Sequence, residues 1–436
     1  MNAPLRRGAC PGLSAPMQTG DGLLVRMLPI GTLPLDAFAS LCAAAREHGN
    51  GVVEVTARGS IQVRGLTPAS APRFAAAIET LGIAAADGIA VHTNPLAGLD
   101  LDEIIDAEKL AANLRHALAE HGLAARLAPK ISVVIDAGSA LGLDGLSADV
   151  RLRAELKNGQ AVLAVGVGGD HATAAQLGFV APADGAEAVV RLLDVIARRG
   201  RDVRARDVIA SEGIDPLGLT ISDLLLRPAR SRESEAPELD SRLRGNERSS
   251  AIGKHRLRDG TLACGVGLAF GHADATSLEN LTKAAAARGA TGLRAAPDRA
   301  QIFVGFSPEA FSAFAADAER QGFIVSADDP RRFVVACAGA PVCASAHIAA
   351  RALAPRIASE CARSLSNGFA IHVSGCAKGC AHPTPAALTV VGTPGGCSLV
   401  SGGTARDAPF ATVTMDELPA ALARHVRASI GEARHV

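Results

Sequence analysis

Four cysteines in the last quarter of the chain have the spacing of metal-binding thiols. Cys337 and Cys343 enclose five residues in the segment ACAGAPVCASAH, and Cys376 and Cys380 enclose three in VSGCAKGCAHP. A cubane iron–sulfur cluster is held by four thiolates, and two pairs of ligands on tight turns can converge on its corners. The spacing therefore predicts a 4Fe-4S cluster with these four residues as its ligands.

Glycine and proline residues shape both cysteine segments. A glycine lets the backbone approach the cluster sulfides without a Cβ in the way, and a proline stiffens the turn. The glycines are Gly339, Gly375 and Gly379, and the prolines are Pro341 and Pro383. Turns of this composition are suited to carry the thiolates.

A structural zinc site and buried, unreactive thiols are the alternative explanations of these cysteines. Zinc sites typically pair cysteines across about two to four residues, which the five-residue spacing does not match. The cluster is therefore favoured over zinc, and both are favoured over inert thiols. A single cysteine is most often a small buried residue. That role is expected for the cysteines that stand singly in helix or strand patterns: Cys42, Cys264, Cys361 and Cys397.

The strands and helices that must position the cysteines belong to a chain in which one order of elements occurs twice. The apolar periodicity predicts a first set at 23–28 (strand), 35–47 (helix), 52–56 and 60–64 (strands) and 72–81 (helix). The same order returns at 262–270, 276–288, 292–295, 301–304 and 308–321. Residues also match at a separation of 240 (241 for the last pair): Gly31 with Gly271, Leu41 with Leu281, Gly49 with Gly289, and Arg58 with Arg299. The chain is therefore predicted to contain an internal duplication.

The segments after each copy also correspond. A helix at 107–121 and strands near 130–135, 149–155 and 161–165 are answered by a helix at 347–360 and strands near 369–374, 388–391 and 398–400. Between the halves, residues 227–256 are dense in charge, Ser and Pro, which predicts a linker. The expected fold is α+β, with two similar halves around a pseudo-twofold axis and a large pocket at their junction.

Composition excludes several classes of protein. Lys plus Arg and Asp plus Glu each number 44, so no overall charge favours nucleic acid or an acidic membrane. Trp and Tyr are absent, which counts against base stacking on single-stranded nucleic acid. No stretch has the roughly 18 consecutive apolar residues that span a bilayer, so a cytoplasmic location without membrane partners is expected. Nine cysteines, an odd number, do not indicate a secreted disulfide framework.

The two cysteine pairs, the SGC opening of the second pair and the duplicated halves resemble the siroheme-dependent sulfite and nitrite reductase superfamily. Within it, the segments RRGACPGLSAPMQTGDGLLVR, HTNPLAGLD and SGCAKGCAHP resemble most closely the precorrin-3B synthase family. The resemblance implies ferredoxin-like half-domains at 1–88 and 257–328 and catalytic half-domains at 89–226 and 329–436. The last of these would carry the cluster, and 227–256 would be the linker.

The resemblance also implies an activity. Members of the family are monooxygenases that take precorrin-3A, a tetrapyrrole, where the reductases hold siroheme. They hydroxylate a meso carbon with O2 and close a lactone with a ring acetate, in aerobic cobalamin biosynthesis. The implied cofactors are a 4Fe-4S cluster and a mononuclear non-haem iron, with NADH as the ultimate electron donor. A separate reductase or a ferredoxin is then expected to pass single electrons to the cluster.

A tetrapyrrole with many carboxylate arms needs several basic donors in one cavity. Arg26, Arg58 and Lys130 fall where the superfamily places basic residues around siroheme and its anionic substrate, and Gln62 fits the same pattern. Arg299 is the repeat partner of Arg58. For each residue alone, a solvated surface charge is the alternative explanation. These five residues are the predicted substrate-binding set.

Three departures from the reductases separate the two activities. Asp87 stands where a further Arg is common, Ser132 where a second Lys is common, and Ala387 where an acid is expected. Each change weakens a site that grips and protonates sulfite or nitrite, which favours the synthase. A siroheme-dependent assimilatory sulfite or nitrite reductase is the main alternative function. A cluster-bearing sensor without catalysis is a third, and the paired basic positions argue against it.

No residue set in the sequence has convincing spacing for a mononuclear iron. Such an iron commonly binds two His and one carboxylate. The candidates near predicted strand ends are His92, His372, His382 and Asp136. The glycine-rich segment AVLAVGVGGDHA lacks the third glycine of a dinucleotide fingerprint, so a turn or a loop against the macrocycle is expected there.

Overall fold

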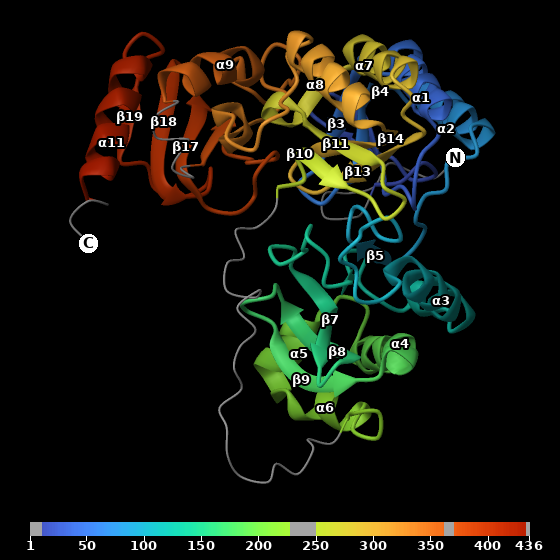
Figure 1. Cartoon of the computed structure of the whole chain (residues 1–436). Coiled ribbons are helices and arrows are strands. Elements are labelled where there is room, and N and C mark those ends of the chain that lie inside the picture. Colours follow the sequence, from blue (N-terminus) through green and yellow to red (C-terminus); the bar gives the residue numbers. More distant parts are fainter. Residues whose placement is uncertain (1–10, 227–249, 362–369, 433–436) are drawn as a thin grey trace.

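The computed structural model describes residues 11–226, 250–361 and 370–432. These residues form four sheets, two built by the duplicated segments and two by the segments that follow them. In Figure 1 the two repeats, blue and yellow, lie together and adjoin both following units, one green and one red. We call the green and red parts the first and second outer units. None of the described helices has the length and apolar character needed to cross a membrane.

The first repeat forms a sheet with two helices. Its elements are β1 (Met17–Thr19), β2 (Gly22–Met27), α1 (Leu35–His48), β3 (Val52–Val55), β4 (Ile61–Leu66) and α2 (Ser70–Thr80). Alternate residues of β3 are buried, and α1 directs Phe38 and Leu41 into the core, as expected of half-buried strands and an amphipathic helix. The predicted strands and helices of this repeat are therefore confirmed.

The second repeat has the same order. Its elements are β10 (Gly253–Arg256), β11 (Leu262–Gly267), β12 (His272–Asp274), α7 (Ala275–Ala287), β13 (Gly292–Ala296), β14 (Ala300–Phe306) and α8 (Pro308–Arg320). The sheet orders β1-β2-β4-β3 and β10-β11-β14-β13 correspond strand by strand. The side chains of Asp274 and Ser307 cap α7 and α8 by accepting backbone N–H groups, which explains where both helices begin.

Each repeat also lends a backbone segment to the sheet of the other. Leu33 of the first repeat pairs with Leu293 in β13, and the two exchange backbone hydrogen bonds of 2.7 and 2.9 Å. Reciprocally, Ala273 in β12 pairs with Val53 in β3. The two pairs are related by the 240-residue separation of the repeats. This reciprocity establishes the pseudo-twofold relation, and one hydrophobic core joins both repeats.

The outer units share one topology. The first contains β5 (Ala90–Thr93), α3 (Ala107–Glu120), β6 (Ser132–Asp136), β7 (Ala148–Lys157), β8 (Gln160–Gly169), β9 (Ala175–Val180), α4 (Gly185–Ala197), α5 (Ala205–Glu212) and α6 (Asp215–Thr220). The second contains β15 (Val334–Ala336), α9 (Ala350–Glu360), β16 (Ile371–Ser374), β17 (Ala386–Thr393), β18 (Gly396–Gly403), β19 (Ala411–Val413) and α11 (Leu418–Glu432). In both sheets the first three strands are parallel and the last two antiparallel.

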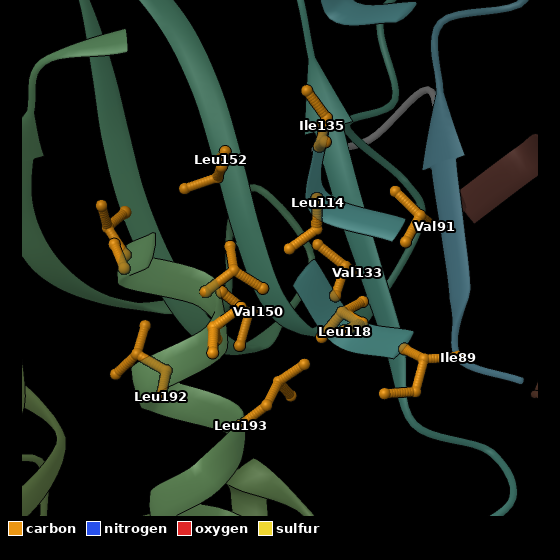
Figure 2. Packing of buried hydrophobic residues seen from close by; sticks show 14 of the residues in the cluster. Ile89, Val91, Leu114, Leu118, Val133, Ile135, Val150, Leu152, Leu192 and Leu193 are labelled. Atoms are coloured by element: carbon orange, nitrogen blue, oxygen red, sulfur yellow. The ribbon is translucent and has the colours of Figure 1, made fainter. Parts of the chain in front are cut away.

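Helices α3 and α4 cover one face of the first outer sheet. Figure 2 shows Leu114 and Leu118 of α3 directed at Val133 and Ile135 of β6, with Leu192 and Leu193 of α4 near Val150 of β7. Each fully buried side chain of this kind stabilises the fold by about 1.5 to 3 kcal/mol relative to exposure. This packing fixes the ends of β5 and β6, where polar side chains emerge.

Three sequence-based expectations are wrong in detail. Gly253–Arg256 lies in the predicted linker but forms β10, because it pairs along β11. The helix predicted from residue 347 begins at Ala350, because the carbonyl of Ile348, which an earlier helix would need for an N–H four residues on, accepts the N–H of Ala340. The glycines expected in a turn or loop, Gly166, Gly168 and Gly169, belong to β8.

Candidate functional site

The paired cysteines follow two neighbouring parallel strands. Cys337 comes directly after β15, and Cys376 comes two residues after the end of β16. Because the carboxyl ends of parallel strands meet at one edge of a sheet, both cysteine segments lie at the same edge. A backbone hydrogen bond of 3.2 Å from Cys337 N to Val373 O joins the strands there.

The thiol of Cys337 already has the surroundings of a ligand. Its Sγ accepts the N–H of Gly375 at 3.0 Å. Burial raises the pKa of Cys337, and the nearby Cys380 and Cys343 raise it further, against the N–H donors of Gly375 and Gly339. Three of the four predicted ligands therefore lie close enough to influence one another's charge. Binding to iron removes this cost, because it neutralises the thiolates.

The turn between β1 and β2 of the first repeat closes over the cysteine loop. Ala344 N donates to Gly20 O at 3.0 Å. A Cβ on Gly20 would collide with Cys343 Sγ, so a larger residue there would require the sulfur to move. Gly20 was not predicted, because nothing in the local pattern connects it to a cysteine more than 300 residues away.

The corresponding edge of the first outer unit is closed by polar side chains. Asn94 follows β5 as Cys337 follows β15, and its Oδ1 accepts the N–H of Ala137 at 2.6 Å, the counterpart of the bond from Gly375 to Cys337. Asn94 Nδ2 donates to Asp136 Oδ1 at 3.0 Å. Asp136 is the last residue of β6, and its carboxylate is fully engaged in this network. The duplicated fold therefore has one edge for thiolates and one sealed by hydrogen bonds.

Among the described residues, no three His, Cys, Asp and Glu side chains are arranged around a position for a single metal ion. The thiolates of a cubane each bind a different iron atom and stand around a larger group, so the cysteine edge fits a cluster. The residues described do not fit a preformed mononuclear iron site. The four cysteines expected in cores are buried, and burial raises the pKa of the Cys42 and Cys264 thiols to about 12.

Two members of the predicted substrate-binding set are joined. Arg26 in β2 donates from Nε and Nη2 to Gln62 Oε1 in β4, at 3.0 and 2.7 Å. Gln62 is almost fully buried, and its Nε2 donates to Glu54 Oε2 at 3.0 Å. Gln62 therefore orients the guanidinium of Arg26.

Glu54 in β3 is the acidic centre of this network and was not predicted. It also pairs with Arg64 in β4 at 3.4 Å and with Arg351 in α9 of the second outer unit. Arg64 in turn forms a two-bond pair with the buried Asp21 of the β1–β2 turn, both bonds being 2.8 Å. This chain of charges connects the sheet of the first repeat to the cysteine loop and to α9.

Arg58 reaches the first outer unit. Its Nη2 donates to Ser132 Oγ at 3.3 Å and to Ser147 O at 2.9 Å. Ser132 is the position where the reductases were expected to carry a second Lys. Lys130, two residues earlier, is exposed in the turn before β6. Arg58 and Lys130 therefore share one region of the molecule.

Arg299 lies on the other side of the network, in the second repeat. It stands in a left-handed turn and packs over Gly271, where a Cβ would meet its side chain. His372 and His382 lie near it, with their ring centroids 5.7 Å apart. Burial, then His382 and Arg299, lowers the pKa of His372 to about 3, and neither of its ring nitrogens has a hydrogen-bond partner among the described residues.

A cleft lies where both repeats meet the first outer unit. Its cavity has a volume of about 50 Å³, and Arg58, His92, Arg115, Glu108 and Arg294 line it. Burial, then Arg58 and Arg115, lowers the pKa of His92 to about 3. Arg115 and Glu108 were not predicted. Their spacing of seven on one face of α3 was the available signal.

This chain resembles a known family, a named protein and a solved structure. The profile described as "Nitrite/Sulfite reductase ferredoxin-like half domain" matches residues 15–81. A protein of Sinorhizobium sp. named "Precorrin-3B synthase" is 39% identical over 424 residues, which cover 97% of this chain and 88% of that protein. The solved structure of the Mycobacterium tuberculosis NirA protein is 20% identical, with a TM-score of 0.71 over 93% of this chain and 80% of that one. That similarity confirms the fold expected from the duplication.

Proposed function

Because this chain belongs to the precorrin-3B synthase family, we propose that it is the monooxygenase that hydroxylates precorrin-3A and closes a lactone on it. The identity over nearly the whole chain carries this proposal. It makes the protein an oxidoreductase of aerobic cobalamin biosynthesis that uses O2 in the cytoplasm. NADH is proposed as the ultimate reductant, acting through a separate reductase or a ferredoxin.

The proposed cofactor is a 4Fe-4S cluster bound by Cys337, Cys343, Cys376 and Cys380. When bound, such a cluster accepts and releases single electrons. The chain's own contribution is to hold the thiolates, to donate the Gly375 N–H to one of them, and to cover the loop with the Gly20 turn. Hydrogen bonds of this kind tune the reduction potential of a cluster. No step is assigned to the family's mononuclear iron, because the described residues do not form a preformed site for it.

The proposed substrate site uses the four basic residues of the predicted substrate-binding set. Arg26, Arg58, Lys130 and Arg299 would bind carboxylate arms of the macrocycle, and Gln62 holds Arg26 in place. A planar guanidinium binds a carboxylate through two parallel hydrogen bonds, which supply orientation as well as energy. A macrocycle held by its rim presents a meso carbon at a fixed position, which hydroxylation at one carbon requires.

The contact between Arg58 and Ser132 supports a synthase over a reductase. Stabilising a small doubly charged oxyanion requires several cationic donors aimed at one point. A Lys at position 132 would add a cation beside the guanidinium of Arg58, whereas Ser132 accepts a hydrogen bond from it. The site therefore keeps cations for the rim of a large substrate and lacks one at its centre.

The test is to purify the protein without air from a host that makes siroheme, then add precorrin-3A, an electron supply and labelled O2. We expect iron and sulfide for one cluster, no stoichiometric siroheme, and a product one oxygen atom heavier with the label from the gas. Sulfite and nitrite should not be reduced with a strong artificial donor. One bound siroheme per chain with rapid sulfite reduction would instead establish a reductase.

A further inference from the structure

Arg115 in α3 is a cation without an acid within hydrogen-bonding distance. Its one hydrogen bond among the described residues runs from Nη2 to Val91 O at 3.4 Å, and its Nε is buried without a partner. Burial lowers the pKa of Arg115, and only the charge of Glu108 opposes this. A guanidinium with an unsatisfied buried N–H is destabilising unless an anion completes its shell.

The neighbours of Arg115 add positive charge. Glu108 forms a 3.0 Å ion pair with Arg294, so the carboxylate that lines the cleft is already engaged. Arg294 donates hydrogen bonds from its other N–H groups to Thr32 and to backbone carbonyls. Arg58 lines the same cleft, and its charge with that of Arg115 helps to keep His92 neutral. The field in the cleft is therefore positive.

The cleft itself is small, with a cavity of about 50 Å³, which suits a single group such as a carboxylate. It adjoins a wider hollow of about 530 Å³, and Arg115, Glu108, Ile30, Gly31 and Thr93 line both. The hollow adds one acid and one base, Asp106 and Lys109, which leave its charge balanced. The walls of the cleft also carry apolar side chains: Leu28, Pro29, Ile30, Val91 and Leu146. A ligand that fits both features has carboxylate groups on a large apolar frame.

We propose that this cleft binds a carboxylate arm of the tetrapyrrole and that Arg115 is the residue that binds it. That the apolar frame is a tetrapyrrole rests on the proposed function. That the cleft takes a carboxylate rests on the geometry of Arg115 and its neighbours. Arg58 lies in both the cleft and the predicted substrate-binding set, so one macrocycle can reach both. His92, neutral and almost fully buried, also lines the cleft and offers its ring to the same arm.

The test uses the full-length protein with its cluster, and uroporphyrin III as an unreactive polycarboxylate tetrapyrrole. We expect Arg115→Met to weaken uroporphyrin binding at least tenfold, because a charge-assisted hydrogen bond is lost. Without ligand, the variant should melt at the same temperature as the natural protein or higher, since the unsatisfied guanidinium is gone. The matched control is Arg73→Met, at an exposed position of α2, which should change neither property.

Other outcomes overturn the proposal. A lower melting temperature with unchanged uroporphyrin affinity would make Arg115 a purely structural residue. Citrate binding as tightly as uroporphyrin, and losing affinity equally in Arg115→Met, would make the cleft a site for small free anions. Absence of precorrin-3A turnover with normal, Arg115-dependent uroporphyrin binding would reject the proposed function and leave the carboxylate site standing.

Discussion

Glu54 in β3 and Arg294 in β13 occupy equivalent positions 240 residues apart and carry opposite charges. Each forms an ion pair with the second residue of the helix that opens an outer unit. Glu54 pairs with Arg351 of α9, and Arg294 pairs with Glu108 of α3 at 3.0 Å. The two pairs are pseudo-twofold counterparts in which the signs of the charges are exchanged.

This exchange distinguishes the two ways of docking the outer units. In the observed arrangement α3 pairs with the second repeat and α9 with the first. The swapped arrangement would place Glu54 against Glu108 and Arg294 against Arg351, and like charges in contact cost free energy. The signs of these charges therefore favour the observed docking of each outer unit over the swapped one.

Reversing one charge of a pair should loosen an outer unit. We expect Arg351→Glu to lower the free energy of unfolding by about 2 to 4 kcal/mol, because both partners are largely buried and would then repel. Arg356→Glu is the matched control, since Arg356 lies on the same helix with its side chain 65% exposed. Urea unfolding measures both. Equal stability of the two variants would remove Glu54–Arg351 as a structural contact.

Loss of one thiolate should deplete the cluster. In Cys343→Ser we expect iron and sulfide well below one cluster per chain and a bleached visible spectrum, because the other cysteines that the structure describes outside the two pairs are buried in hydrophobic cores. Cys42→Ala, a change on α1 within the hydrophobic core that joins both repeats, should retain the cluster. Chemical iron and sulfide analysis of anaerobically purified protein is the measurement. A full complement in Cys343→Ser would contradict the ligand assignment.

A methyl group on the β1–β2 turn should disturb the same loop from outside. Gly20→Ala would press against Cys343 Sγ, and relieving such overpacking typically costs about 1 to 3 kcal/mol. The expected result is faster loss of iron in air, followed by absorbance. Gly12→Ala is the control, because no atom lies within 4 Å of the added methyl. Identical decay of the two variants would show that the turn does not seal the cluster.

Removal of Arg58 should weaken tetrapyrrole binding and spare the cluster. Arg58→Ala should lose about 1.5 to 3 kcal/mol of binding free energy, the contribution of one hydrogen bond to a charged group. Fluorescence titration with uroporphyrin III measures the affinity, and the visible spectrum reports on the cluster. Unchanged affinity would return Arg58 to the role of a contact between the first repeat and the outer unit.

Acid should destabilise the fold partly through His92. Its folded pKa of about 3 lies below the unfolded value near 6.5, so the unfolded chain binds the proton first. The stability is therefore complete above about pH 6.5 and is lost as the pH falls toward 3. His92→Gln should reduce the slope of unfolding free energy against pH by up to about 1.4 kcal/mol per unit. His116→Gln, at an exposed position, should leave it unchanged.

The sequence alone determined the features that depend on neighbouring residues. The pairs around Cys337 and Cys376 are short-range patterns, and so are the periodic strands and helices that repeat after 240 residues. A duplication of elements is also enough to predict two related halves. The same reasoning identified Arg58 as a site candidate, because its motif is local.

Only the tertiary structure decided which parts of the two halves meet. The approach of Gly20 to Cys343, the network centred on Glu54, and the position of Arg115 in a cleft all join distant segments. Such contacts depend on how sheets and helices pack, and a residue's type and spacing do not encode its distant neighbour. The exchanged ion pairs make this clearest: Glu54 and Arg294 are equivalent in the repeat, and packing against different helices gives each its partner.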